Sequence, residues 1–111
     1  MKRIILEMGV GTDLEGTDYT KAACRAVEDA LRHVYMPLFR ARGLDTAVME
    51  VAVTIAAQRP EAVDRDAVAA VLPYGRISVD CVHGGLDVAH EGVGETSVIV
   101  NAALDVRHPM A

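Results

Sequence analysis

Apolar and polar positions along the chain follow two different periods, and the places where the period changes divide it into elements. Alternation of every second residue predicts strands, whereas apolar residues three and four apart predict helices. The resulting order is β-α-β-α-β-β. The predicted segments are a strand at 3–10, a helix at 18–35, a strand at 47–57, a helix at 65–72, a strand at 76–82 and a strand at 96–106.

Two helices of this length need a sheet to cover, so we expect one α+β domain over residues 1–111. Its architecture is a two-layer sandwich in which two helices cover one face of a mixed four-stranded sheet. The covered face is expected to hold Ile4, Leu6 and Met8 of the first strand with Met49, Val51 and Val53 of the second. The opposite face would hold Ile5, Glu7, Ala52, Thr54, Ser78 and Val82.

That opposite face is mixed in polarity and small in its side chains. It has fewer lysines and glutamates than a solvated face and fewer apolar residues than a helix-covered one, so we favour packing between subunits. An ordinary exposed face with a few apolar residues is the alternative.

Proline and glycine mark the boundaries. Pro37 is expected to end the first helix, and residues 40–45 to form a turn. His83-Gly84-Gly85 should interrupt the third strand as a bulge or tight bend before residues 86–88, and residues 91–95 read as a hairpin loop. The tail from His108 is expected to be loose.

The stretch Met8–Lys21 is the favoured site. Its glycines suggest a turn between the first strand and the first helix, where backbone can approach a ligand, and Thr17 or Asp18 can cap the helix. Lys21 lies in the first helical turn, where the helix dipole disfavours a cation, so it is a candidate for holding an anionic group; pairing with Asp18 or Glu28 is the alternative.

His83 beside two glycines is the second candidate, because a histidine there can reach a cleft and the glycine N–H groups can bind an oxyanion. The predicted catalytic residues are therefore Lys21, His83 and Asp13. The predicted ligand-binding residues are Glu7, Gly9, Gly11, Thr12, Thr17, Asp18, Gly84, Gly85 and Asn101.

Several other chemistries fit less well. The glycine spacing after the first strand lacks a third glycine, its acids would repel a pyrophosphate, and no Gly-Lys-Ser/Thr completes a phosphate loop. His83, Asp87, His90 and Glu91 could be metal ligands, but their spacing is irregular. We therefore predict neither a metal nor a cofactor.

Acids inside apolar strands are a third clue. Glu7, Glu50 and Asp80 interrupt such strands, and two of them meeting across a subunit interface could supply a general base. Pairing with Arg3 and Arg76 on the same face is the alternative, and we favour it for Glu50.

Composition narrows the partners. The net charge of −5 argues against nucleic acid and anionic membranes, and the apolar run after Met1 is too short for a signal peptide or a membrane span, so a cytoplasmic protein is expected. Cys24 and Cys81 lie in apolar patterns and read as reduced core thiols. With only 4% aromatic residues the core is built from small side chains, which would gain from a second subunit.

Taken together, several motifs spread over nearly the whole chain resemble a small microbial family of conserved hypothetical proteins named after a Listeria open reading frame. The resemblance implies a stand-alone domain and no catalytic residue. Glu15 departs from the family pattern, in which a histidine often stands there. The motifs are Glu7-Met8-Gly9-x-Gly11-x-Asp13, Thr20-Lys21-Ala22-Ala23-x-Arg25-Ala26-Val27, Pro73-Tyr74-Gly75, Gly84-Gly85-Leu86 and Asn101-Ala102-Ala103.

Two functional hypotheses follow. The first is a homo-oligomeric enzyme or small-molecule-binding protein with sites at subunit boundaries, such as a hydrolase or isomerase acting on a small polar or anionic metabolite. The second is a structural or protein-interaction module, in which the glycine turns only close the sheet and the mixed face docks another chain.

Overall fold

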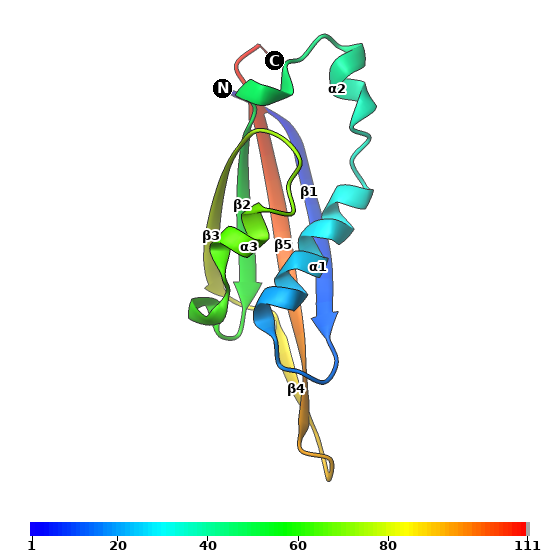
Figure 1. Ribbon diagram of the computed structural model, residues 1–111, viewed down its shortest axis with the longest axis vertical. Helices are drawn as coiled ribbons and strands as arrows, with labels where there is room; N and C mark the ends of the chain where they lie inside the picture. Colours follow the sequence, from blue (N-terminus) through cyan, green and yellow to red (C-terminus); the bar gives the residue numbers. More distant parts are fainter. Residues whose placement is uncertain (111) are drawn as a thin grey trace.

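Five strands form one mixed sheet, and the helices lie on one of its faces (Figure 1). The computed structural model describes residues 1–110. The elements are β1 (Lys2–Asp13), α1 (Tyr19–Arg32), α2 (Pro37–Ala41), the 3-10 turn η1 (Thr46–Val48), β2 (Glu50–Ala57), the 3-10 turn η2 (Pro60–Ala62), α3 (Arg65–Ala69), β3 (Arg76–His83), β4 (Leu86–His90) and β5 (Glu95–His108).

The long strand β5 organises the sheet, whose order is β1-β5-β2-β3. On one side β5 pairs antiparallel with β1 along almost its whole length, from Val98 opposite Asp13 to His108 opposite Lys2. On the other side it pairs with β2 near the chain termini and with β4 at the opposite end. β2 and β3 are parallel, because η2 and α3 connect them. The α+β prediction is therefore confirmed.

The sheet has one strand more than predicted, because the third strand divides at Gly84-Gly85. Gly85 has a φ of +64°, and a Cβ on it would lie 2.2 Å from the Ile99 carbonyl oxygen, so only glycine allows this crossing. After the crossing, β4 pairs with β5 instead of continuing β3. The β4–β5 hairpin extends beyond the rest of the sheet as an arm, and the molecule measures 55 × 22 × 18 Å (Figure 1).

The glycine stretch after residue 8 is strand, not turn, which corrects the sequence prediction. β1 continues through Gly9 and Gly11 to Asp13. A Cβ on Gly9 would lie 2.2 Å from the Ala26 carbonyl oxygen, and one on Gly11 would lie 2.1 Å from that of Ala22. These two glycines let the backbone of α1 approach the strand closely, so their absence of a side chain serves helix packing.

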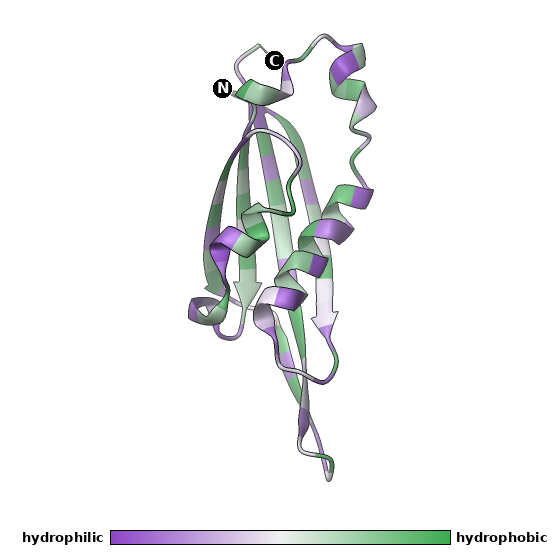
Figure 2. Ribbon diagram, viewed as in Figure 1, coloured by the Kyte–Doolittle hydropathy of each residue, from purple (hydrophilic) through white to green (hydrophobic). Residues whose placement is uncertain are grey.

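The same contact corrects the predicted faces of β1. Because the glycines face α1, the odd-numbered positions from Ile5 onward lie under the helix, whereas Leu6, Met8 and Val10 lie on the uncovered side and are exposed. For the second strand the prediction is correct, since Met49, Val51 and Val53 are buried. Apolar and polar residues alternate along the strands in Figure 2.

The buried core lies between the sheet and the helices. Five alanine and valine residues of α1 are buried completely, and every second residue of β2 and β5 faces them. The core residues are Tyr19, Ala22, Ala23, Ala26, Val27, Ala30, Phe39, Met49, Val51, Val53, Ile55, Ala57, Val63, Val68, Leu72, Val98, Val100, Ala102, Leu104 and Val106.

Helix boundaries follow their caps. Of the two predicted caps of α1, Asp18 is the one observed, since its side chain accepts a hydrogen bond from the Lys21 N–H at 3.0 Å. Asp64 caps α3 by accepting the N–H groups of Asp66 and Ala67. α1 ends at Arg32, before Pro37. Pro37 occupies the first position of α2, where a missing N–H costs nothing. Residues 40 and 41 are therefore helical, and only residues 42 and 43 of the turn predicted at 40–45 form one.

The C-terminal segment is not loose at His108, which corrects another prediction. His108 is the last residue of β5 and only 1% exposed. Its Nδ1 accepts the Met110 N–H at 3.0 Å, so its Nε2 carries the proton and donates to the Asp45 carbonyl at 3.0 Å. The histidine thereby ties the end of β5 to the segment before η1. Among the described residues 1–110, no helix is both long and apolar enough to cross a membrane.

Candidate functional site

The loop and helix start at residues 13–21, here called the corner, hold most of the predicted site residues. Asp13 is 6% exposed, and its Oδ2 accepts the Asp18 N–H at 2.9 Å. Thr17 has a φ of +53°, and its hydroxyl donates weakly to the Thr96 carbonyl at 3.4 Å. The N–H groups of Asp18 and Lys21 are thus occupied by carboxylates of the chain itself, which leaves less of the helix N-terminus free for an anion.

Lys21 also has a partner within the corner. Its Nζ lies 3.9 Å from Asp13 Oδ1, at the outer limit of an ion pair. Arg25 donates to the Thr12 carbonyl at 2.6 Å. A broad hollow of about 510 Å³ lies beside them, lined by Asp13, Leu14, Glu15, Gly16, Asp18, Lys21 and Arg25. Its three acids outnumber its two bases, so the corner is poorly suited to the anion that Lys21 suggested.

His83 does not meet the corner. It is exposed at the end of β3, and within residues 1–110 no hydrogen bond or ion pair joins it to Lys21 or Asp13. The Gly84 N–H donates to the Ala57 carbonyl at 3.0 Å, while Gln58 Nε2 donates to the carbonyls of Gly84 and Gly85. The Gly84 N–H is therefore already occupied within the sheet, and oxyanion binding at Gly85 stays a prediction.

The remaining predicted residues are scattered. Asn101 is exposed on the uncovered face of β5, opposite Val10 and Ala56. Glu7 is half-buried under the helix layer, and its carboxylate accepts the N–H of Met8. Glu50 and Asp80 are exposed in the single chain, on the face of the sheet opposite the helices, and their meeting across a subunit interface stays a prediction.

Arg3 pairs with Asp105, at 3.1 Å, rather than with Glu7 or Glu50. No group of three or more metal-ligating side chains comes together anywhere in residues 1–110, so His83, Asp87, His90 and Glu91 do not form such a cluster. His90 instead lies 2.7 Å from the Ser97 hydroxyl.

One polar contact that the sequence did not reveal joins α1 to the arm. The buried Tyr19 hydroxyl donates to Asp87 Oδ2, and the other oxygen of this carboxylate is buried without a partner among the described residues. The hydrogen bond to Asp87 raises the pKa of Tyr19, as do burial and the negative charge of Asp87. This pair fixes the arm against the start of α1.

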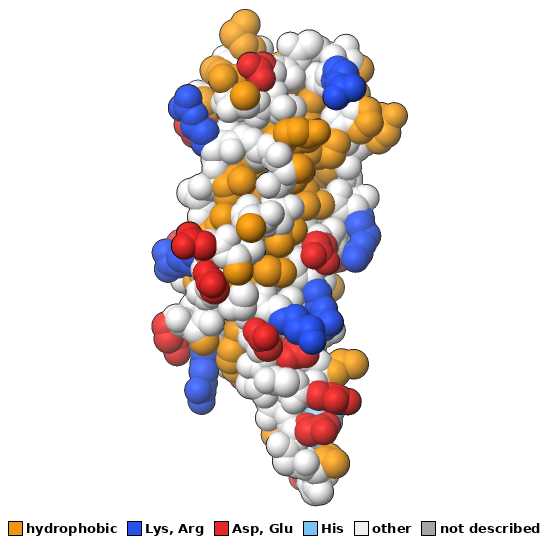
Figure 3. Space-filling model, viewed as in Figure 1, with side chains coloured by type: hydrophobic (Ala, Val, Ile, Leu, Met, Phe, Trp, Pro, Cys, Tyr) orange, Lys and Arg blue, Asp and Glu red, His pale blue; other side chains and the backbone are white. Residues whose placement is uncertain are grey.

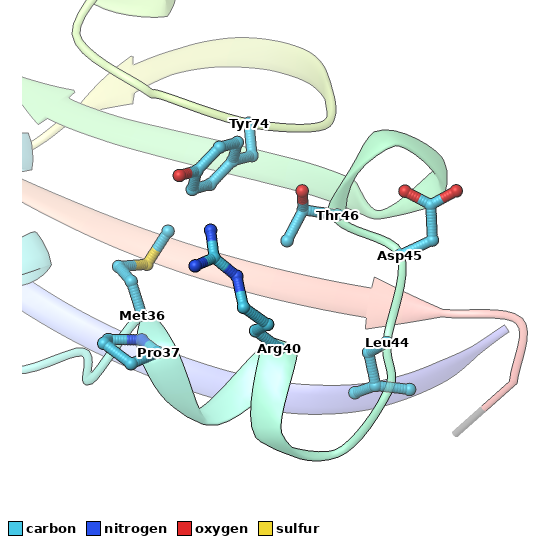
Figure 4. Close-up of a pocket in the computed structure, with 7 residues that line it drawn as sticks. All are labelled: Met36, Pro37, Arg40, Leu44, Asp45, Thr46 and Tyr74. Carbon is cyan, nitrogen blue, oxygen red and sulfur yellow. The ribbon is translucent and has the colours of Figure 1, made fainter.

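A different pocket lies at the termini end of the helix layer, away from the corner. It has a volume of about 310 Å³ and is lined by residues of α2, of η1 and the segment before it, and of the loop after α3 (Figure 4). We call it the groove. Its lining residues are Met36, Pro37, Arg40, Leu44, Asp45, Thr46 and Tyr74.

The groove continues toward the core. A narrow apolar cleft of about 20 Å³ shares Met36 and Tyr74 with it and is bounded by Leu31, Val34, Phe39, Met49, Val51, Leu72, Pro73, Leu104 and Val106. In Figure 3, apolar side chains gather on the surface between α1 and the segment that follows α3. α1 does not reach the termini end of the sheet, and α2 has only five residues. The helix layer therefore covers this end of the sheet incompletely, and large side chains leave a cleft there.

Arg40 supplies the charge of the groove. Its guanidinium points across the pocket toward Tyr74, whereas the Asp45 carboxylate points away from it (Figure 4). Asp45 accepts the Ala47 N–H at 2.9 Å, which caps η1. Within residues 1–110 Arg40 forms no ion pair, so its five N–H donors remain available to a ligand.

The groove was not predictable from a sequence in which residues 40–45 read as a turn. One pattern could have indicated it: Pro37 at the start of a second helix puts Leu38 and Phe39 in that helix, and Phe39 is buried. Phe39 then holds α2 on the core, so that Arg40 and Met36 face Tyr74.

The fold is a mixed sheet with helices on one face, and within residues 1–110 the predicted catalytic residue His83 lies apart from Lys21 and Asp13. The match to known proteins agrees with this class. Residues 3–106 match the family described as conserved hypothetical protein (Lin0512_fam), and the chain belongs to that family.

A crystal structure of an FtsZ-like protein of unknown function from Nostoc punctiforme is similar over 96% of both chains, with 33% identity and a TM-score of 0.82. Comparison with curated proteins finds no match.

Proposed function

We propose that this protein binds a small amphipathic anion in the groove, with Arg40 as the anion ligand. The observation that carries the proposal is an unpaired guanidinium on the wall of a pocket that opens onto an apolar cleft. Pockets of about 300 Å³ or more with an apolar lining and a few polar groups are typical small-molecule sites. The corner, with its internal hydrogen bonds and surplus of acids, has weaker support.

The lining suggests how such a ligand would lie. A carboxylate or phosphate at Arg40 can accept two parallel N–H bonds, and the Thr46 and Tyr74 hydroxyls can donate to further oxygens. The apolar body would rest on Met36, Pro37 and the Tyr74 ring, with its end directed to the cleft. Arg40, the two hydroxyls and the apolar residues of the lining account for binding, so the proposal is limited to a binding function.

Calorimetric titration with sodium hexanoate and sodium phenylacetate tests this proposal, with 1-hexanol as the uncharged control. Ligands of this size bind with Kd values on the order of 1 mM. We expect both carboxylates to bind and hexanol to bind at least about tenfold more weakly, because a hydrogen bond to a charged group contributes about 1.5–3 kcal/mol.

Substitution of Arg40 tests whether the ligand binds in the groove. Arg40→Gln should weaken hexanoate binding about tenfold or more, and Arg40→Lys should fall between, since lysine keeps the charge but cannot form the paired hydrogen bonds. Arg42→Gln is the matched control, because Arg42 lines a separate hollow with Ile4 and Ile5. Loss of binding in Lys21→Ala with retention in Arg40→Gln would move the site to the corner and refute the proposal.

A further inference from the structure

The face of the sheet opposite the helices, here called the open face, carries exposed apolar side chains on three strands. Leu6, Met8 and Val10 occupy alternate positions along β1, Val82 lies near the end of β3, and Leu86 and Val88 lie on β4. Their exposed fractions are between 39% and 63%. A monomeric protein rarely exposes this many large apolar side chains on one face of a sheet.

Between these residues the face is flat. Along the rows that cross the sheet, Met8 lies opposite Ala103, which lies opposite Thr54, and Val10 lies opposite Asn101, which lies opposite Ala56. Small side chains in the middle and larger ones at the edge allow a second sheet to approach at the ordinary distance of about 10 Å.

The charges of the open face are balanced, unlike those of the chain. In the body of the sheet Arg3, Arg76 and Arg107 are matched by Glu50, Asp80 and Asp105, whereas the whole chain carries a net charge of −5. Arg107 also lies opposite Glu50 in the sheet. A symmetric contact brings the same patch together twice, so the charges on such a patch can pair with one another only when both signs are present.

The size of the face is adequate. Four strands at about 4.8 Å spacing and eight residues at about 3.3 Å rise give about 500 Å² in projection, and the arm adds about 150 Å². The accessible area exceeds the projected area, which brings it near the 800 Å² or so per partner of a standard interface.

We infer that a second copy of this chain covers the open face, so that two sheets pack face to face. We expect the charged end of one sheet to face the charged end of the other. In the opposite orientation the arginines of one copy would be buried against the apolar end of its partner, without counter-charges. This surface is separate from the groove, which lies on the helix side, so either proposal can fail without the other.

Sedimentation equilibrium of the wild-type chain and of Met8→Lys and Val88→Lys tests the inference. We expect a wild-type dimer at micromolar concentration and at least a tenfold weaker association in each variant. Tyr35→Lys is the matched control and should remain dimeric, because Tyr35 is 72% exposed but lies between α1 and α2 on the helix side.

Circular dichroism of the variants checks that they are folded, and two substitutions on different strands guard against a local folding defect. A wild-type monomer at 100 μM overturns the inference. So does a dimer that both Met8→Lys and Val88→Lys leave intact, because another surface would then hold it together.

Discussion

The two halves of the helix-covered face are packed in opposite ways. At the hairpin end, glycines of β1 meet alanines of α1 and the two backbones come into contact, leaving no space. At the termini end, Phe39, Met36 and Tyr74 pack over Leu104 and Val106 and leave a cleft and a pocket. Small residues thus build a closely packed half, here called the closed half, and large residues with short helices build the half that can accept a ligand.

The difference also explains why the predicted site and the observed groove do not coincide. Glycine near a helix start is common in binding loops. Here the backbone of α1 occupies the space that side chains on Gly9 and Gly11 would fill. Space for a ligand arises where no long helix covers the sheet.

Substitution of Gly11 should disrupt the closed half most. In Gly11→Ala the new methyl group would lie 2.1 Å from the Ala22 carbonyl oxygen and 2.4 Å from the Ala26 nitrogen, so the helix must move. We expect a loss of at least about 3 kcal/mol in the free energy of unfolding, measured by urea denaturation.

Gly43→Ala is the control for Gly11→Ala. Gly43 has a φ of +69° and open space around it, so only the backbone conformation opposes a side chain there. Gly43→Ala should lower the free energy of unfolding by about 1 kcal/mol. Equal losses in the two variants would mean that close packing of α1 is not what requires Gly11.

The same valine truncation should have different effects in the two halves. Val100 is fully buried under the closed half, whereas Val106 borders the cleft. Val100→Ala leaves a new cavity and should cost about 2 kcal/mol, while Val106→Ala enlarges existing space and should cost about 1 kcal/mol. Urea denaturation of both variants checks this, and the reverse order would contradict the contrast.

Removal of the α1 cap should have a moderate effect. Asp18→Ala loses the hydrogen bond to the Lys21 N–H and should lower the free energy of unfolding by about 1 kcal/mol. Asp18→Ser, which keeps a capping oxygen, should retain most of it. If thermal unfolding shows the two variants to be alike, the cap is not the source of the stability.

The Tyr19–Asp87 contact predicts a pH effect at the alkaline end. The folded pKa of Tyr19 is raised above the ordinary value of about 10, so its contribution to stability is complete below that pH and is lost as pH rises through the folded pKa. Tyr19→Phe should remove this alkaline loss. Unfolding midpoints between pH 9 and 12 check it; parallel curves for the two proteins would contradict it.

Much of the fold was predictable because its strands alternate regularly and its caps are explicit. Asp18, Asp64 and the alternation in β2 gave correct elements. The face of β1 was not predictable, since Gly9 and Gly11 have no hydrophobic side chain to mark the covered side. The crossing at Gly85 was also not predictable, because two glycines fit a bulge within one strand as well as a change of partner strand.

The site was less predictable than the fold. Lys21, Asp13 and Asp18 do come together, but the contacts between them are visible only in three dimensions. The groove joins residues 36–46 to Tyr74, which are distant in sequence and carry no motif.

A ¹⁵N-¹H NMR titration of the wild-type protein with sodium hexanoate tests directly whether the ligand binds in the groove and not in the corner. Amides of α2, of residues 44–46 and of Tyr74 should shift in a saturable manner, while those of residues 13–21 should stay in place. Saturable shifts centred on residues 13–21, or none at either place, would contradict the account.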